Sequence, residues 1–99
     1  MSKTTIRVVA RVVAHPNQVE AVKSALMALI EPTRQEEGCI VYELLQNQQD
    51  STDFTFVEEW ASNTLLEAHL ASAHIAKAVS QLEGLIAIEP DIRTYQLIA

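Results

Sequence analysis

The sequence predicts an α+β protein on the split β-α-β-β-α-β plan, a ferredoxin-like arrangement of one antiparallel sheet with two helices on one face. Four short segments have strand-like composition or alternation, and two longer segments carry apolar residues at helical spacing. The chain has 99 residues, of which 48% are hydrophobic and 20% are charged. That length provides one hydrophobic core, so we expect a single domain over residues 1–99.

The first half of the chain is expected to hold one strand and one helix. Residues 6–14 are rich in valine and lack helical spacing, which predicts a strand with one face formed by Ile6, Val8, Ala10, Val12 and Ala14. A helix is predicted over about 17–31, with Asn17 as the N-cap of a capping-box start. Pro32 ends or kinks this helix, and another turn can follow over 32–37.

The other three strands are predicted from alternation and from the polar turns between them. Residues 39–46 form the second strand, and residues 54–60 form the third. The period of two in the third strand places four side chains on one face: Phe54, Phe56, Glu58 and Trp60. Residues 92–98 are predicted to form the last strand.

A second helix is expected between the third and fourth strands. Ser62 is suited to cap its start, and apolar residues follow at helical spacing. The segment Ser72-Ala73-His74 is a candidate interruption, and Gly84 is a candidate terminator.

Composition excludes several classes of function. Seven basic residues against thirteen acidic ones give a net charge of −6, without the basic footprint that a nucleic-acid binder needs. No apolar run approaches the roughly 20 residues that span a bilayer, and the N-terminus lacks the pattern of a signal peptide. The single cysteine, Cys39, forbids an intrachain disulfide. We therefore expect a cytoplasmic protein with no nucleic-acid or membrane partner.

The sheet predicts a second copy of the chain as a partner. Both predicted helices cover one face, and the strands carry apolar residues on the other face as well. A partner's sheet is the simplest cover for that face, so we expect a homodimer joined sheet to sheet.

The candidate chemistry lies at the end of the third strand and on the second helix. Glu58 and Trp60 share a face with two phenylalanines, where a buried carboxylate needs a partner or takes a proton. Alternatively, Glu58 lies at a solvent-facing strand end or merely caps a neighbouring residue. His69 lies at the apolar stripe of the helix, either as a satisfied half-buried residue or as a general base paired with Glu58.

Three further observations concern neighbours of this pair. Tyr42 on the second strand either hydrogen-bonds a substrate oxygen or packs as an ordinary aromatic. A continuous helix would point His74 away from His69, and only a break near Ser72-Ala73 would bring both to one pocket. The histidines and Glu58 do not follow a recognised metal-ligand spacing. Since glycine-rich phosphate loops and zinc motifs are also lacking, we expect neither metal nor cofactor.

The order of several short motifs resembles the antibiotic biosynthesis monooxygenase (ABM) domain family over nearly the whole chain. The segments that carry the resemblance are Glu36-Glu37-Gly38-Cys39, Tyr42-Glu43, Phe54 to Glu58-x-Trp60-x-Ser62, Leu66-Glu67-Ala68-His69 and Ser72-Ala73-His74. The resemblance implies a dimeric α+β barrel. Members of this family include monooxygenases that oxidise phenols and quinols without a cofactor and an isomerase of a phosphorylated autoinducer. Other members degrade haem and generally use an asparagine in the first strand. Residues 6–14 contain no asparagine, which counts against haem chemistry.

Carried onto this sequence, the resemblance implies a monooxygenase acting on a small hydroxylated aromatic, such as a quinol or polyphenol, with dioxygen. His69 is then the base and Glu58 orients it. Trp60 and Phe56 form the wall of the substrate pocket, with Tyr42 and His74 as further substrate-binding candidates. Two alternatives remain: an isomerase of a small phosphorylated sugar-like molecule, in which His69 and Glu58 move a proton α to a carbonyl, or a dimer that binds a ligand without turnover.

Overall fold

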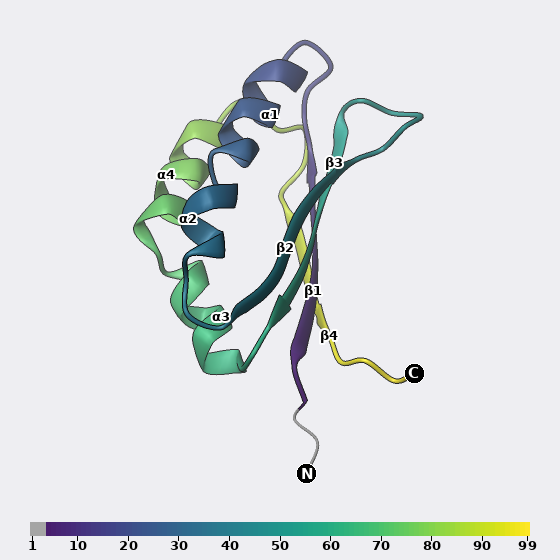
Figure 1. Cartoon of the computed structure of the whole chain (residues 1–99). Coiled ribbons are helices and arrows are strands. Elements are labelled where there is room, and N and C mark those ends of the chain that lie inside the picture. The colour runs from purple at the N-terminus through teal and green to yellow at the C-terminus, as the bar shows by residue number, and fades with distance from the viewer. Residues whose placement is uncertain (1–3) are drawn as a thin grey trace.

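The computed structural model describes residues 4–99, and its eight elements follow the predicted order (Figure 1). The strands and helices are β1 (Ile6–Val13), α1 (Val19–Met27), α2 (Ile30–Arg34), β2 (Cys39–Gln46), β3 (Asp53–Trp60), α3 (Asn63–Leu70), α4 (Ala73–Leu82) and β4 (Asp91–Tyr95). Each of the two predicted helices is thus divided into two shorter ones.

The four strands form one antiparallel sheet in the order β2-β3-β1-β4. The helices all lie on one face of this sheet, as Figure 1 shows. This arrangement confirms the ferredoxin-like α+β fold. The register pairs Ala10 of β1 with Phe56 of β3, and Tyr42 of β2 with Glu58 of β3. A β-bulge between Cys39 and Val41 shifts the register at the start of β2.

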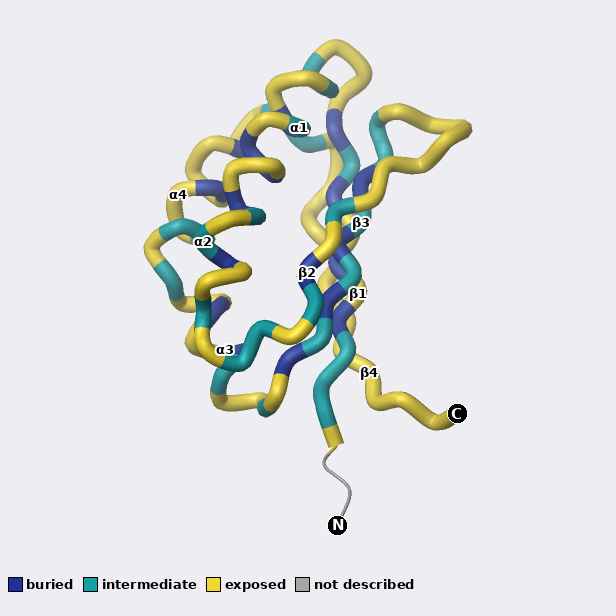
Figure 2. The backbone as a smooth tube through the Cα atoms, viewed as in Figure 1, coloured by how far each residue is buried: buried dark blue, intermediate teal, exposed yellow. Residues whose placement is uncertain are grey.

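The core lies between the sheet and the helices. In β3 every second residue is buried, and the buried set is the predicted one: Phe54, Phe56, Glu58 and Trp60. In β1 the face that carries Val8 to Ala14 is buried in the same way, and Figure 2 shows this alternation along the central strands. From α1, Val22 and Leu26 complete the opposite side of this layer. The face assignment is therefore confirmed, and Glu58 is buried rather than solvent-facing.

Two local predictions for the first helix are wrong. The N-cap of α1 is Gln18, which makes no side-chain capping hydrogen bond, so the capping box predicted at Asn17 does not form. The helical region breaks at Ala28 and Leu29, before Pro32 rather than at it. Pro32 instead lies in the first turn of α2, where a missing N–H costs no helical hydrogen bond.

The interruption of the second helix lies at Ala71 and Ser72. Ser62 and Ser72 each cap a helix by accepting a hydrogen bond from the backbone N–H three residues later. A serine that begins a new helix turns the chain at that point. The following strand is shorter than predicted, because β4 ends at Tyr95.

The face of the sheet that the helices leave uncovered is mixed in character. It carries exposed apolar side chains, including Val9, Leu45 and Tyr95, beside the ion pairs Arg11–Asp53 and Arg93–Asp91. Within residues 4–99, no helix has both the length and the apolar character needed to cross a membrane. The predicted dimer and cytoplasmic location stay predictions.

Candidate functional site

A mostly apolar cavity of about 100 Å³ lies between the sheet and the helices. Side chains of β1, β2 and β3 form its floor, and side chains of α1, α3 and α4 form its roof. Among its lining residues, three can form side-chain hydrogen bonds: Tyr42, Glu58 and His69. The other lining residues are apolar, so a ligand in this space meets few, well-defined polar groups.

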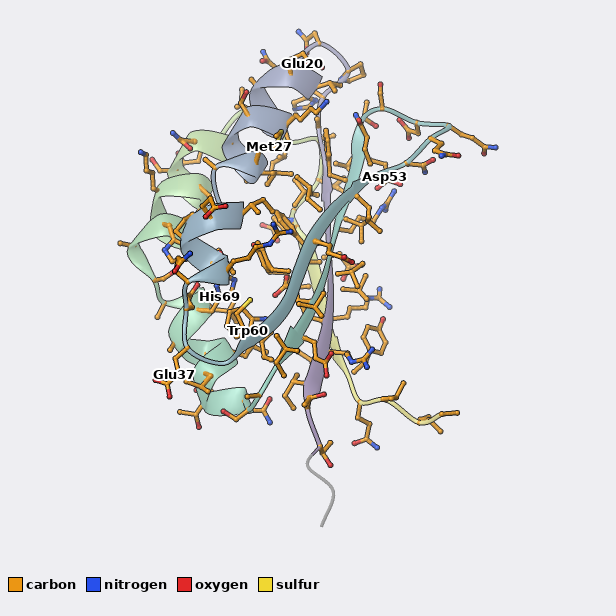
Figure 3. The ribbon with its side chains drawn as sticks, in the orientation of Figure 1. Glu20, Met27, Glu37, Asp53, Trp60 and His69 are labelled. Atoms are coloured by element: carbon orange, nitrogen blue, oxygen red, sulfur yellow. The ribbon has the colours of Figure 1, made fainter. Side chains whose placement is uncertain are left out.

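His69 belongs to an aromatic cluster at one end of this cavity. Its ring lies 4.6 Å from the Trp60 ring and 5.5 Å from the Tyr42 ring, centroid to centroid. Tyr42 also stacks on Phe56 at 4.9 Å. Figure 3 shows His69 and Trp60 in the layer between helices and sheet, whereas Glu37 points away from it. The imidazole is therefore held on several sides, and the His69 side chain is only 2% exposed.

One carboxylate oxygen joins the two histidines. Glu36 Oε2 lies 2.6 Å from His69 Nδ1 and 2.8 Å from His74 Nε2. An ionised carboxylate only accepts hydrogen bonds, so each ring nitrogen that faces Glu36 donates to it. In its neutral form, His69 then has its proton on Nδ1 and a free lone pair on Nε2. A carboxylate that fixes an imidazole in this way prepares Nε2 to act as a base.

Two local features bring these three side chains together. Gly38, at φ +86°, lets the loop that carries Glu36 lie directly against α3, because a Cβ at this position would lie 2.8 Å from Cβ of Leu65. On the other side, the new helix that begins after Ser72 turns His74 back toward His69. The helix break that His74 needs in order to approach His69 is thus present.

Glu58 was predicted to pair with His69, but its carboxylate is hydrogen-bonded to Trp60. Its Oε1 accepts a hydrogen bond of 2.8 Å from Nε1 of Trp60, two residues along the same strand. Burial raises the pKa of Glu58, an effect opposed by the Trp60 hydrogen bond and by the nearby His69. Burial, with a further contribution from Glu58, also raises the pKa of Tyr42, which keeps its hydroxyl protonated.

Glu58→Gln is expected to be more stable than wild type at neutral pH. Folding raises the pKa of Glu58 above its ordinary value of 4.5. The free energy of unfolding of the wild type therefore falls as the pH rises from 4.5 through the pKa of Glu58 in the folded state. Glutamine does not titrate, and its amide oxygen can still accept from Trp60. Urea unfolding well below and well above the ordinary glutamate pKa measures the effect.

The matched control for this substitution is Glu43→Gln, which removes one negative charge from an exposed position of β2. The advantage of Glu58→Gln over wild type should grow with pH, whereas the control should stay close to wild type throughout. A constant difference between Glu58→Gln and wild type across the pH range would contradict the raised pKa.

The structure separates the six predicted site residues into two groups. His69, Glu58, Tyr42 and Phe56 line the cavity. Trp60 does not line it: it is fully buried, packs against the His69 ring and donates to Glu58. His74 lines a different, surface depression of about 200 Å³ and reaches the cavity only through Glu36 and His69.

Sequence reasoning missed Glu36 as a site residue. The hydrogen bond to His69 that was predicted for Glu58 comes from Glu36, 33 positions before the histidine. Glu58 lies on the same strand face as Trp60, as predicted, and its carboxylate accepts a hydrogen bond from that residue. The available signal was Gly38, since a glycine two residues after a carboxylate can mark a close backbone approach.

The same three side chains are chemically able to hold a metal ion. Within residues 4–99, the one group that brings three ligand atoms of this kind together consists of Glu36, His69 and His74. All three atoms lie within 4.8 Å of one another. Two imidazoles and a carboxylate are a common ligand set for divalent transition metals.

A family model described as antibiotic biosynthesis monooxygenase matches residues 5–81. Among curated proteins, "Uncharacterized protein sll1783" of Synechocystis is 27% identical over 82 residues, and "Putative monooxygenase Rv0793" of Mycobacterium tuberculosis is 31% identical over 81 residues. These alignments cover 83% and 82% of the chain. The chain spans 56% of the length of the first relative and 79% of the second.

Solved structures agree with this match. The crystal structure of PA3566 from Pseudomonas aeruginosa is similar at a TM-score of 0.93 and 30% identity, covering 100% of this chain and 99% of that one. The structure of Rv0793 is similar at a TM-score of 0.89 and 25% identity, covering 96% of both chains. The similarity extends over the whole sheet and its helices, since nearly all of each chain is covered.

Proposed function

The chain belongs to the antibiotic biosynthesis monooxygenase family, and from this premise we propose that it oxidises a small hydroxylated aromatic with dioxygen, without a cofactor. The observation that carries the proposal is the placement of His69. Its Nδ1 is bonded to Glu36, its ring is buried among aromatics, and it lines an apolar cavity. The relative named as a monooxygenase supports the same reaction class.

In the proposed reaction, Nε2 of His69 removes the phenolic proton of the substrate. Glu36 holds the imidazole in the required tautomer and stabilises the imidazolium that forms. This role replaces the one predicted for Glu58. Glu58 and Tyr42 are instead available to hydrogen-bond oxygen atoms of the substrate, since both line the same cavity.

The chemistry balances without an external reductant. The electron-rich anion forms a bond to one atom of dioxygen from a ring carbon that carries hydrogen and lies ortho or para to the ionised oxygen, which gives a peroxide. Loss of the ring C–H proton and cleavage of the O–O bond then leave a carbonyl on the ring and release the second oxygen as water. The substrate supplies all four electrons, so phenol plus dioxygen gives quinone plus water. The mostly apolar lining of the cavity favours this path.

The size of the cavity favours a one-ring substrate. Its volume of about 100 Å³ is of the same order as an apolar cavity of about 150 Å³ known to hold benzene. We therefore propose a monocyclic quinol or polyphenol rather than a polycyclic one.

The isomerase alternative fits this cavity less well. A phosphorylated substrate needs positive charge or several N–H donors around its phosphate. The residues that line the cavity include no lysine or arginine. A mostly apolar lining suits an aromatic ring, so the oxidation is the function that we propose.

The test is oxygen consumption by chelator-treated protein with a panel of monocyclic quinols and polyphenols. We expect uptake above the autoxidation rate of each compound, accompanied by formation of the quinone, which is followed by absorbance. Uptake no faster than autoxidation with every compound would contradict the proposal. That result would favour the alternative of a dimer that binds a ligand without turnover.

We also propose that the protein is a homodimer joined through the uncovered face of the sheet. Val9, Leu45 and Tyr95 expose 38–51% of their surface on that face. The segment after β4 adds Leu97 and Ile98, both exposed. Apolar side chains of this kind, among paired charges, are typical of a surface that a second copy covers.

Sedimentation velocity tests this assembly. The chain mass is 11.0 kDa, so a dimer has twice that mass. We expect Leu45→Glu, which places a charge on the face, to shift the protein toward monomer, whereas Ala76→Glu on the exposed side of α4 should not. A wild-type protein that sediments only as monomer would contradict the proposal.

A further inference from the structure

We propose that Glu36, His69 and His74 form a binding site for one divalent transition-metal ion of the Zn²⁺ type. The three side chains come from three separate places in the chain: the loop between α2 and β2, the last turn of α3 and the first turn of α4. Their convergence is thus a product of the fold and not of local sequence.

The chemistry of the three ligands suits such an ion. Imidazole nitrogen and carboxylate oxygen bind Zn²⁺ at about 2.0–2.2 Å, so two ligand atoms on one ion lie roughly 3 Å apart. The distances from Glu36 Oε2 to the two histidine nitrogens are 2.6 and 2.8 Å. An ion bound between the three atoms requires these two contacts to lengthen by a few tenths of an ångström. Two imidazoles and one carboxylate leave further coordination positions free.

Burial of the cluster favours binding over simple hydration. The side chains of His69 and Glu36 are 2% and 17% exposed, and that of His74 is 24% exposed. His74 lines the surface depression of about 200 Å³ on the helical side. An ion can therefore reach the cluster from solvent beside His74 without passing through the apolar cavity.

Binding has a consequence for His69 that rests on the proposed function. An ion bound to Nδ1 of His69 displaces the proton that now faces Glu36, and the neutral ring then carries its proton on Nε2. A ring in that state has no free nitrogen lone pair, so it cannot remove a proton from substrate. The metal-bound protein is therefore the inactive form of the proposed oxygenase.

The experiment is calorimetric titration of the tag-free, chelator-treated 99-residue chain with Zn²⁺. A parallel titration with Co²⁺ is followed by its visible absorption. We expect one ion per chain, and no binding of Mg²⁺, which prefers oxygen ligands. His74→Ala and Glu36→Gln should each weaken Zn²⁺ binding at least tenfold. His15→Ala, which removes an exposed histidine outside the cluster, is the matched control and should bind as wild type does.

Two results would overturn the site: no Zn²⁺ bound by wild type, or equal binding by wild type, His74→Ala and Glu36→Gln. Circular dichroism checks that each variant is folded, and the partly exposed His74 is the substitution least damaging to the core. Heat and Co²⁺ absorption report binding without turnover, so a failed oxygen-uptake assay does not affect this result. In active protein, Zn²⁺ should abolish oxygen uptake and chelator should restore it.

Discussion

His69→Ala is expected to lower the rate of substrate-dependent oxygen uptake by about 10²–10⁴-fold, the usual contribution of a positioned general base. The substitution removes the one imidazole that lines the cavity and the group that Glu36 orients. Chelator-treated variant and wild type are compared by oxygen electrode over a range of substrate concentrations. We expect the loss in kcat, because the base acts on bound substrate.

Two further variants separate catalysis from folding. His69→Asn keeps a side-chain N–H that can reach Glu36 but lacks the second ring nitrogen, so it should remain folded and be as inactive as His69→Ala. His15→Ala changes an exposed histidine and should retain full uptake. Substrate-dependent oxygen uptake by His69→Asn at the wild-type rate would show that His69 is not the base.

Gly38→Ala is expected to destabilise the protein by about 2 kcal/mol or more and to disturb the contact between Glu36 and His69. A non-glycine residue at φ +86° costs on the order of 1–3 kcal/mol. The added Cβ would also lie against the side chain of Leu65, at 2.8 Å from its Cβ, and overpacking of this kind costs about 1–3 kcal/mol. Urea unfolding measures the loss.

Gly84→Ala is the matched control, because Gly84 has φ +78° but nothing within 4 Å of the added Cβ. Gly84→Ala should lose only the free energy of unfolding that the strained backbone costs. The difference in this loss between the two variants therefore measures the contact of residue 38 with α3. The added Cβ also meets Cγ and Cδ1 of Leu65, so adding Leu65→Ala to Gly38→Ala should recover part of that difference. Equal losses in Gly38→Ala and Gly84→Ala would show that the loop does not need its close approach to α3.

Because side chains in a strand alternate between faces, the sequence alone determined which side chains of β1 and of β3 share a face. The packing of the helices decided which face is buried, and with it the burial of Glu58. The predicted bounds of β2 also agree with those observed, Cys39–Gln46. Family membership followed from motif order, and residues 5–81 match the family model.

Contacts between distant segments were decided only by the tertiary structure. Nothing local in the sequence pairs Glu36 with a histidine 33 positions later, because that contact depends on how the loop at Gly38 packs on α3. Glu58 and Trp60 share a strand face in the sequence, but the hydrogen bond between them was shown only by the folded structure. Periodicity determines which face a side chain occupies, whereas its partner there depends on the packing of elements against one another.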